Sequence, residues 1–393
     1  MPSPPLRAAT LDYLARTPLA KRKALGQFFT PAALRDALLR DLEVAPGERV
    51  LDPACGTGEF LVDAAGRFPG AEIVGWEIDD EPAAVAARAV PGATVEVRDA
   101  LEAPFAPGFD LVIGNPPYFE RRLDPATRAR FASAISGRPN SYALFVLLGL
   151  ELLRDGGRLA FVLPPSMNNG RYFERLRTHL LSVARVERLE LPHAPDLFDG
   201  ASQRVMLLRL VKGERDDGRH VFRRGAFTLL CDDPAALARP FEGATTLADL
   251  GYTVRTGSVV WNQVKGDLVD GGDGAVRLIW SHDIRDGALS FAGRPGKPGF
   301  VRGKAPLVGP AIVCNRVTGS GRNARLRVAL VPSGIEFVGE NHVNVALPPP
   351  GTPEREVRRV VERLAEPRAL AAVRRLTGNT QISSRELLHL VPF

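Results

Sequence analysis

Asn115-Pro116-Pro117-Tyr118 follows directly on the apolar run 110–114 and combines the side chains best suited to chemistry in this sequence. Two adjacent prolines fix the backbone and remove two N–H donors, so the loop presents acceptors. An amino group would find two of them, the side-chain oxygen of Asn115 and the carbonyl of Pro116. The Tyr118 ring offers a flat face for stacking. These residues predict a site for an amino group on a planar ring; a proline turn that merely packs a tyrosine is the alternative.

A second cluster, Asp52-Pro53-Ala54-Cys55-Gly56-Thr57-Gly58, lies where an expected strand meets an expected helix. Glycines at such a turn allow tight backbone geometry and the close approach of a ligand, and ligands of open α/β sheets bind at the carboxyl ends of strands. The turn lacks the three-glycine dinucleotide fingerprint and the lysine of a phosphate loop. The pattern predicts a pocket for a cofactor that need not carry phosphates, with a purely structural turn as the alternative.

Acidic residues end the next two expected strands. Glu77 stands where a carboxylate accepts hydrogen bonds from ribose hydroxyls in such folds, and Asp99 repeats the arrangement one strand later. We expect Glu77 to hold a ribose and Asp99 to accept from an adenine amino group. Helix capping or plain solvation is the competing interpretation for both.

The elements that would position these residues alternate regularly along the first half of the chain. Short apolar runs alternate with helical patterns, which is typical of a parallel sheet covered by helices on both faces. We expect strands at 49–53, 72–77, 94–97, 110–114, 158–163, 186–191 and 204–211, and helices at 31–42, 59–68, 81–90, 140–153 and 172–181.

Beyond residue 212 the alternation weakens and glycine and proline become frequent. We therefore expect a catalytic domain over 1–225 and a second domain over 240–393. The second domain is expected to be mainly β, apart from a helix at 353–376, where apolar residues recur at helical spacing.

The net charge of +6 is confined to this second part: residues 1–213 carry 26 basic and 26 acidic side chains, and 214–393 carry 25 and 19. No acidic residue occurs between Asp286 and Glu336, a stretch with eight basic ones, and such a stretch attracts a polyanion. A solvated basic surface is the alternative. Three widely spaced cysteines favour neither disulfides nor a zinc site, and the absence of a long apolar run or signal peptide predicts a soluble, cytoplasmic protein.

The Asn-Pro-Pro-Tyr loop resembles the amino-methyltransferase motif of adenine-N6 DNA methyltransferases, which also occurs in relatives that act on protein glutamine. Leu25-Gly26-Gln27-Phe28-Phe29-Thr30-Pro31 looks like the cofactor segment that precedes the glycine turn in the gamma-class DNA enzymes. The similarity is specific over residues 25–211, and within it the modification methylases of type II restriction systems match best. Three segments of the C-terminal part, 256–257, 340–344 and 376–380, look like landmarks of their recognition domains.

The resemblance implies the fold of S-adenosylmethionine-dependent methyltransferases, a Rossmann-like, mostly parallel, seven-stranded sheet, with a smaller, mainly β recognition domain. It implies S-adenosylmethionine as cofactor and double-stranded DNA as substrate. It assigns the cofactor to Gln27, Phe28, Thr30, Asp52, Pro53, Ala54, Gly56, Gly58, Glu77, Ile78, Asp99, Asn115 and Phe145, and the target adenine to Asn115, Pro116, Pro117, Tyr118 and Phe198. Phe198 would face Tyr118 across the base; a core position is its alternative.

In the basic tail, Asn315, Arg316, Arg322 and Arg325 are candidates for DNA contacts, because Asn suits adenine and Arg suits guanine in the major groove. One catalytic and one recognition domain on a single chain allow a working monomer, and a cognate restriction endonuclease would be a functional partner. RNA adenine methylation, protein glutamine methylation and non-catalytic DNA binding are the competing functions. We expect transfer without a metal or a covalent enzyme intermediate.

Overall fold

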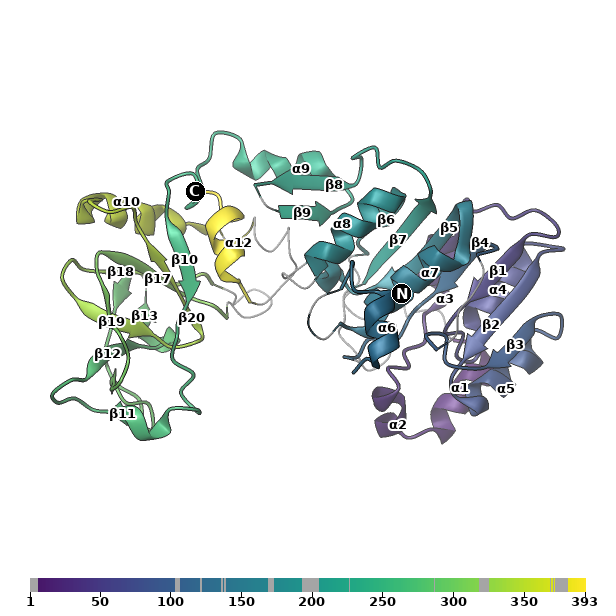
Figure 1. Cartoon of the computed structure of the whole chain (residues 1–393), viewed down its shortest axis with the longest axis horizontal. Coiled ribbons are helices and arrows are strands. Elements are labelled where there is room, and N and C mark those ends of the chain that lie inside the picture. Colours follow the sequence, from purple (N-terminus) through teal and green to yellow (C-terminus); the bar gives the residue numbers. More distant parts are fainter. Residues whose placement is uncertain are drawn as a thin grey trace. The chain divides into compact units, whose positions relative to one another are not determined.

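The structure is a computed structural model that describes residues 6–102, 107–120, 122–135, 137, 139–168, 173–192, 205–225, 227–285, 287–317, 325–367, 369, 371 and 381–393 (Figure 1). The chain divides into two compact units. The N-terminal unit comprises Met1–Phe222 and Thr228–Pro234, and the C-terminal unit comprises Arg223–Phe227 and Ala235–Phe393.

A seven-stranded sheet organises the N-terminal unit, with strand order β3-β2-β1-β4-β5-β7-β6. β7 runs antiparallel to both of its neighbours, and the other pairings are parallel. The strands are β1 (Arg49–Asp52), β2 (Glu72–Glu77), β3 (Thr94–Val97), β4 (Phe109–Gly114), β5 (Leu153–Leu163), β6 (Ala184–Glu190) and β7 (Met206–Lys212). All seven predicted strands are therefore present, and the mostly parallel α/β fold is confirmed.

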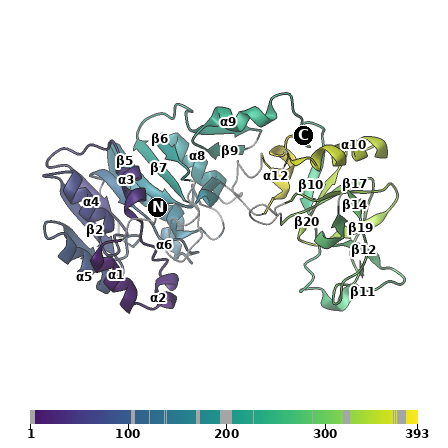
Figure 2. The same cartoon turned by 180° about the vertical axis from the view of Figure 1, so that it is seen from behind.

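Helices cover both faces of this sheet, as Figures 1 and 2 show from opposite sides. One face packs against α3 (Ala32–Leu39), α4 (Glu59–Arg67) and α5 (Asp80–Ala89), and the other against α7 (Ser141–Leu152) and α8 (Glu174–Val183). Successive side chains of a strand point to opposite faces, so in β4 Leu111 and Ile113 join the first core and Val112 joins the second. The unit also contains α1 (Ala8–Arg16), α2 (Leu19–Ala24) and α6 (Pro125–Arg130).

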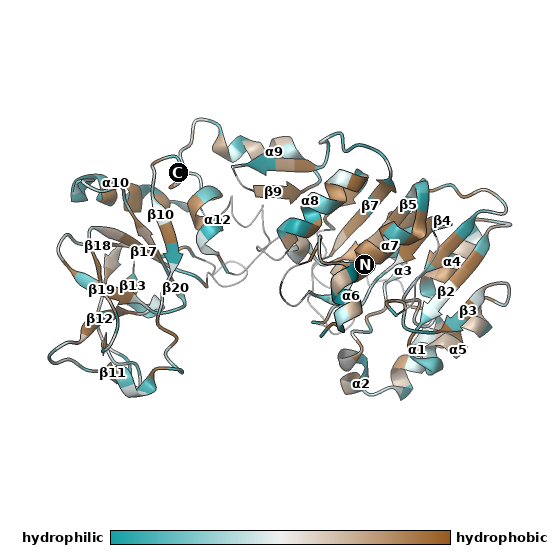
Figure 3. Ribbon diagram, viewed as in Figure 1, coloured by the Kyte–Doolittle hydropathy of each residue, from teal (hydrophilic) through white to brown (hydrophobic). Residues whose placement is uncertain are grey.

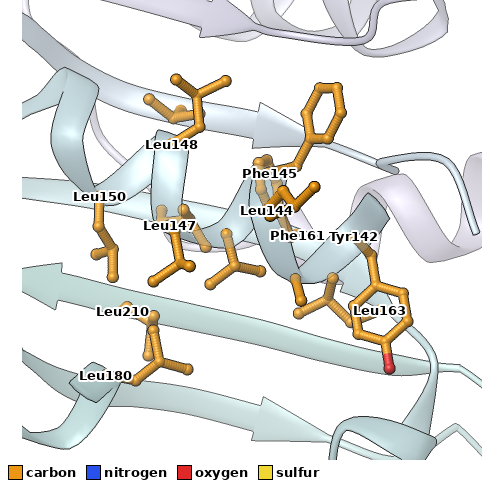
Figure 4. Close-up of a cluster of buried hydrophobic side chains, with 14 of the residues drawn as sticks. Tyr142, Leu144, Phe145, Leu147, Leu148, Leu150, Phe161, Leu163, Leu180 and Leu210 are labelled. Atoms are coloured by element: carbon orange, nitrogen blue, oxygen red, sulfur yellow. The ribbon is translucent and has the colours of Figure 1, made fainter. Parts of the chain in front are cut away.

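The helix α7 is buried on nearly all sides, with only Glu151 exposed among its residues. A helix that is apolar all round belongs inside a domain. Figure 4 shows its leucines packed against Phe161 and Leu163 of β5, Leu180 of α8 and Leu210 of β7. In the hydropathy view of Figure 3, β7 and much of β5 are correspondingly brown. This packing fixes the helix that follows the Asn115 loop.

The C-terminal unit is mainly β, as predicted. An antiparallel sheet of four strands has the order β10-β20-β17-β18, and a mixed sheet of five has the order β11-β15-β12-β19-β16. Their bounds are β10 (Thr253–Thr256), β11 (Leu268–Val269), β12 (Val276–Ile279), β15 (Phe300–Val301), β16 (Leu307–Val308), β17 (Ala311–Asn315), β18 (Val328–Val331), β19 (Glu336–Gly339) and β20 (Val343–Leu347). A short pair is formed by β13 (Ile284–Arg285) with β14 (Ala288–Leu289). The pair of β8 (Val221–Arg224) with β9 (Phe227–Leu230) contains residues assigned to each of the two units.

Helices α10 (Glu354–Leu364) and α12 (Ser384–His389) pack on the four-stranded sheet, and α9 (Pro234–Ala238) precedes it in the chain. The predicted helix at 353–376 is thus present as α10, which ends at Leu364; residues 372–380 lie outside the described part of the chain. None of the described helices is long and apolar enough to cross a membrane.

Two of the recognition-domain landmarks meet in this unit. Gly257 donates its N–H to the Val343 carbonyl at 2.7 Å, and a Cβ on Gly257 would lie 2.1 Å from the Glu340 carbonyl oxygen. Only glycine fits there. Thr256 Oγ1 donates to Asn344 Oδ1 at 3.3 Å, and Asn344 is fully buried. The third landmark, 376–380, lies outside the described residues.

Candidate active site

A pocket lies at the carboxyl ends of β1, β2, β3 and β4, where an open α/β sheet binds its ligands. Its lining includes twelve of the thirteen residues predicted to bind the cofactor, with Gly58 as the exception. The full lining is Leu25, Gly26, Gln27, Phe28, Phe29, Thr30, Asp52, Pro53, Ala54, Cys55, Gly56, Glu59, Phe60, Glu77, Ile78, Arg98, Asp99, Ala100, Asn115, Pro117, Phe119, Ser141 and Phe145.

The glycine turn between β1 and α4 forms one wall of the pocket. Gly56 has φ of 54°, in the left-handed region that favours glycine, and a Cβ on it would lie 3.2 Å from the Phe29 ring. Gly58 has another role: with φ of 88° it begins α4, and a Cβ there would lie 3.0 Å from the Cα of Ala86 in α5. Gly58 therefore lets two helices approach each other.

Two buried carboxylates stand in the pocket wall. Glu77 is 6% exposed; its Oε2 accepts from the Gly56 N–H at 2.8 Å and its Oε1 from the N–H groups of Ile78 and Asp79, both at 3.0 Å. Asp52 is 2% exposed, and burial raises its pKa to about 8. Burial likewise raises the pKa of Glu77, against the opposing effect of its backbone hydrogen bonds. Such a wall favours a ligand that brings positive charge.

Farther along the same edge, Asp99 Oδ1 accepts from the Leu101 N–H at 2.9 Å, so this carboxylate also stabilises the loop after β3. Ile78 lines the pocket with 53% of its surface exposed. Phe145 reaches the pocket from α7 and is otherwise buried. The three residues expected around an adenine ring thus border one space.

The predicted cofactor segment, residues 25–31, forms the opposite wall. Both phenylalanines reach the pocket: Phe28 stacks with Tyr118 at 6.4 Å between ring centroids, and Phe29 meets Tyr13 edge-on at 5.8 Å. The Tyr13 hydroxyl donates to Gln27 Oε1 at 2.9 Å. Thr30 Oγ1 and Gln27 Nε2 are buried and have no hydrogen-bond partner among the described residues. Buried polar atoms of this kind are expected to be satisfied by a ligand.

Asn115 joins this segment to the catalytic loop. Its Nδ2 donates to the Phe28 carbonyl at 3.0 Å, while its buried Oδ1 has no partner among the described residues. The preceding residue, Gly114, has φ of 147°, and a Cβ there would lie 2.7 Å from Asp52 Oδ1. The amide is thus oriented by one hydrogen bond and keeps a free acceptor at the pocket.

Tyr118 lies beside the pocket without lining it. Its hydroxyl donates to the Val162 carbonyl at 2.9 Å and its ring meets Tyr142 edge-on at 5.9 Å. Burial raises the pKa of Tyr118, so the phenol stays neutral. Pro117 lines the pocket, and Pro116 is buried behind it. Phe198, the predicted partner of Tyr118, lies outside the described residues.

A buried charge cluster behind the pocket was not predicted. Arg35, with a side chain 2% exposed, contacts Glu59 Oε2 at 2.8 Å and Asp63 Oδ2 at 2.5 Å, and it donates to the Thr30 carbonyl. Arg7, before α1, pairs with the same two carboxylates. The cluster ties α1 and the cofactor segment to the start of α4. The only sequence signal was the pair Glu59 and Asp63, four residues apart on one helix face.

The four predicted DNA contacts differ in their surroundings. Asn315 is 1% exposed; its Nδ2 donates to the carbonyls of Val317 and Arg325, and its Oδ1 accepts from the Arg327 N–H. Its amide holds a loop and is unavailable to a base in this structure. Arg316 is half-buried and donates to the Asn341 carbonyl at 3.3 Å. Arg325 is exposed, and Arg322 lies outside the described residues.

The strand order, the antiparallel β7 and a pocket beside a glycine turn that lacks phosphate-binding features define an S-adenosylmethionine-dependent methyltransferase fold. The family can be stated as well: the profile described as "N-6 DNA Methylase" matches residues 10–228, and the chain belongs to this family. Membership implies S-adenosylmethionine as the methyl donor and DNA as the substrate.

The relatives are type II modification methylases. The chain is similar to modification methylase CviBIII of Paramecium bursaria Chlorella virus NC1A, with 26% identity over 66% of this chain and 67% of that protein. It is 28% identical to type II methyltransferase M.CvrRI of Paramecium bursaria Chlorella virus XZ-6E, over 76% of this chain and 79% of that protein. Among solved structures, the chain is similar to the type I restriction-modification system methyltransferase subunit from Streptococcus thermophilus. The two share 18% identity with a TM-score of 0.41, over 52% of this chain and 50% of that one.

Proposed function

We propose that this chain is a site-specific DNA adenine-N6 methyltransferase that takes its methyl group from S-adenosylmethionine. The observation that carries the proposal is the free Oδ1 of Asn115 at the pocket, next to two prolines without N–H groups. An exocyclic amino group has two hydrogens to donate, and Asn115 Oδ1 and the Pro116 carbonyl are its acceptors. A nitrogen held in this way directs its lone pair away from the ring plane, which is catalysis by positioning and electrostatics.

The pocket residues fit the donor. Thr30 and the turn 52–58 would hold its methionine part, the Glu77 carboxylate its ribose, and Ile78, Asp99 and Phe145 its adenine. The methionine part of S-adenosylmethionine carries a sulfonium cation as well as the polar groups of an amino acid. The carboxylate of Asp52 would supply negative charge for it, and the unpaired atoms of Thr30 and Gln27 would supply hydrogen bonds. When bound, S-adenosylmethionine supplies a methyl group activated by its sulfonium. We propose direct transfer, with no residue of the chain forming a covalent intermediate.

An adenine inside a duplex is stacked and paired, so it must leave the helix to reach Asn115, at a cost of a few kcal/mol. Stacking with Tyr118, and with Phe198 on the other side, would offset about 1–3 kcal/mol per aromatic contact. The Tyr118 ring is already held in place by its hydroxyl and by Tyr142. Its role would be to receive the base and exclude water rather than to move a proton.

The C-terminal unit would recognise the target sequence. Its positive charge supplies phosphate contacts, which give affinity, and its loops supply base contacts, which give specificity. We retain Arg316, Arg322 and Arg325 as candidates for the phosphate backbone and no longer propose Asn315, whose amide is used internally. We further propose that the protein acts as a monomer in the cytoplasm and protects host DNA from a cognate restriction endonuclease.

The first experiment measures methyl transfer from labelled S-adenosylmethionine to unmethylated duplex DNA, followed by nucleoside analysis. Label in N6-methyladenine is expected. Cofactor binding with label in RNA or protein instead would overturn the substrate and keep the fold.

The Asn115→Ala variant tests the mechanism. Transfer should fall by at least about a thousandfold, because the amide both holds the amino group and positions it, while cofactor affinity should stay within several-fold. Tyr118→Phe is a comparison variant: it keeps the stacking ring and loses one of the contacts that hold it, the hydrogen bond to Val162, so its loss of transfer should be much smaller. Turnover retained by Asn115→Ala would contradict the proposed role of that side chain.

A further inference from the structure

The connection between β14 and β15 contains a tight turn, Arg294-Pro295-Gly296-Lys297. The Lys297 N–H donates to the Arg294 carbonyl at 3.0 Å, which closes the turn, and Gly296 has φ of 72°. Proline at the second position and a glycine with positive φ at the third are the requirements of a type II turn. Proline and the closing hydrogen bond make this a stiff structure, with Arg294 and Lys297 at its two ends.

The turn stands away from the rest of the C-terminal unit. Residues 291–296 are all exposed, and Phe291 keeps 45% of its surface. A Cβ on Gly293 or Gly296 would meet no heavy atom within 4 Å among the described residues. The open space around the turn leaves room for the wall of a DNA groove or for a phosphate backbone.

Aromatic side chains anchor both ends of the connection. At its end, Lys297 Nζ lies 3.6 Å from the ring centre of Trp261 and 4.5 Å from that of Trp280, and Trp280 Nε1 donates to the Pro298 carbonyl at 2.9 Å. At its start, the Arg277 guanidinium lies 4.6 Å from the ring centre of Phe291. The same guanidinium lies 3.8 Å from the Phe300 ring, on the neighbouring strand β15. The tip is therefore supported on both sides.

Two aromatic rings hold the Lys297 ammonium, and no ion pair among the described residues neutralises it or the Arg294 guanidinium. No acidic residue occurs between 286 and 336. The nearest carboxylate in sequence within the described part, Asp283, is buried and accepts from the Trp280 N–H. A cation over an aromatic face keeps its full charge, unlike one paired with a carboxylate. The turn thus presents fixed positive charge to an anionic partner.

We propose that this turn enters a groove of duplex DNA, with Arg294 donating two hydrogen bonds to the O6 and N7 edge of a guanine and Lys297 contacting a phosphate. Arg294 would then be a specificity-determining residue. Arginine is the side chain that matches this edge of guanine in the major groove. The turn is closed by one bridge between Arg294 and Lys297, so it presents a narrow tip to the groove. The inference rests on the proposed function, because it presupposes that duplex DNA is the substrate.

The test compares full-length wild type with Arg294→Ala and with Arg359→Ala, which removes one exposed arginine from the outer face of α10. Each protein methylates genomic DNA that lacks N6-methyladenine, and sequencing identifies the modified sites. If Arg294 contacts a guanine, methylation of sites altered at one guanine position should rise roughly 5- to 150-fold relative to the wild-type site. Arg359→Ala should keep the wild-type site preference.

A second variant, Gly296→Val, keeps every charge and places a β-branched residue at a φ that it adopts only with strain. Its methylation should lose selectivity at the same guanine position as that of Arg294→Ala. The salt dependence of its binding to a fluorescent 30-base-pair duplex should stay unchanged. Unaltered site preference in both variants would overturn the inference. So would uniform weakening of Arg294→Ala at all sites, which indicates a phosphate contact alone. Wild type that methylates no DNA at all would instead refute the proposed function.

Discussion

The two units of this protein differ in how often a carboxylate accompanies their cations. In the N-terminal unit most arginines that form interactions pair with carboxylates, and Arg49, Arg98 and Arg130 in addition lie over aromatic rings. The paired arginines are Arg7, Arg35, Arg49, Arg67, Arg98, Arg130, Arg154, Arg158, Arg185, Arg188 and Arg209. In the C-terminal unit, Lys265, Arg277, Lys297, Arg363 and Arg385 lie over aromatic rings. Arg224 combines a ring contact with a pair to Asp249, and Arg358 pairs with Glu354.

This difference separates two uses of charge. A carboxylate cancels the charge that it fixes, whereas an aromatic face fixes a cation and leaves its charge available to a partner. The first arrangement suits a unit whose charges hold segments around a pocket. The second suits a unit that must attract the phosphates of a polyanion. Loss of a cation should therefore affect stability in one unit and DNA binding in the other.

The largest effect is expected for Arg35→Met in the N-terminal unit. The substitution leaves Glu59 and Asp63 buried with one guanidinium fewer and removes the donor to the Thr30 carbonyl. The free energy of unfolding should therefore fall by about 3–5 kcal/mol. Arg67→Met is the matched control: its pair with Asp36 is largely exposed, and the loss should stay below about 1 kcal/mol. Urea denaturation of the two variants measures the difference.

A loss of less than about 1 kcal/mol in Arg35→Met would contradict a structural role for the cluster. If Arg35 also positions the cofactor segment, cofactor affinity should fall in Arg35→Met. In Arg35→Lys the free energy of unfolding should recover more completely than the cofactor affinity does. A lysine can approach one carboxylate, but it lacks the fork that reaches Glu59, Asp63 and Thr30 together.

A smaller effect, visible in its pH dependence, is expected for Asp52. Burial raises its pKa to about 8, so the folded protein binds this proton more tightly than the unfolded chain, and its contribution to stability falls as the pH rises from about 4 to about 8. A cationic ligand beside Asp52 prefers the ionised carboxylate. Affinity for S-adenosylmethionine should therefore increase from pH 6 to pH 8 by up to about tenfold per unit.

Asp52→Asn should bind the cofactor more weakly at pH 8 and flatten this profile, as measured by titration calorimetry. Glu77 faces the same pocket and its pKa is raised as well, so a residual slope in the variant is assigned to Glu77. A wild-type affinity that does not change between pH 6 and pH 8 would contradict the ionisation of Asp52 on binding.

The sequence predicted those parts of the site that depend on local pattern. The glycine turn, the acids that end β2 and β3, and the Asn115 loop each follow an apolar strand, and parallel strands bring their carboxyl ends to one edge. The resemblance implied seven, mostly parallel strands, whereas the strand order and the position of the antiparallel β7 were not predicted. The cluster of Arg7, Arg35, Glu59 and Asp63 joins residues up to 56 positions apart, and no local pattern reports such a contact.

The C-terminal unit was harder to predict because residue type does not determine exposure. Asn315 has a side chain suited to reading adenine, yet it ends β17, where its amide closes a loop inside the unit. Arg294 is one of eight basic residues in a stretch without acids, and nothing in the sequence ranks it above the others. Its distinction comes from the turn and from the rings that support it.

The smallest effect on stability, and the sharpest test of the comparison, is expected for Lys297→Met. Methionine keeps an apolar stem over Trp261 and Trp280 and removes the charge, so the free energy of unfolding should change by less than about 1 kcal/mol. DNA binding should nevertheless weaken, and the slope of log affinity against log salt should become shallower by about 0.9, the value for one lost phosphate contact. Arg67→Met, which also loses one cation, should leave that slope unchanged. The opposite result would be that Lys297→Met destabilises the fold as much as Arg35→Met does and leaves the salt slope unchanged. That result would show that the charge of Lys297 stabilises the fold, and it would contradict the distinction between the two units.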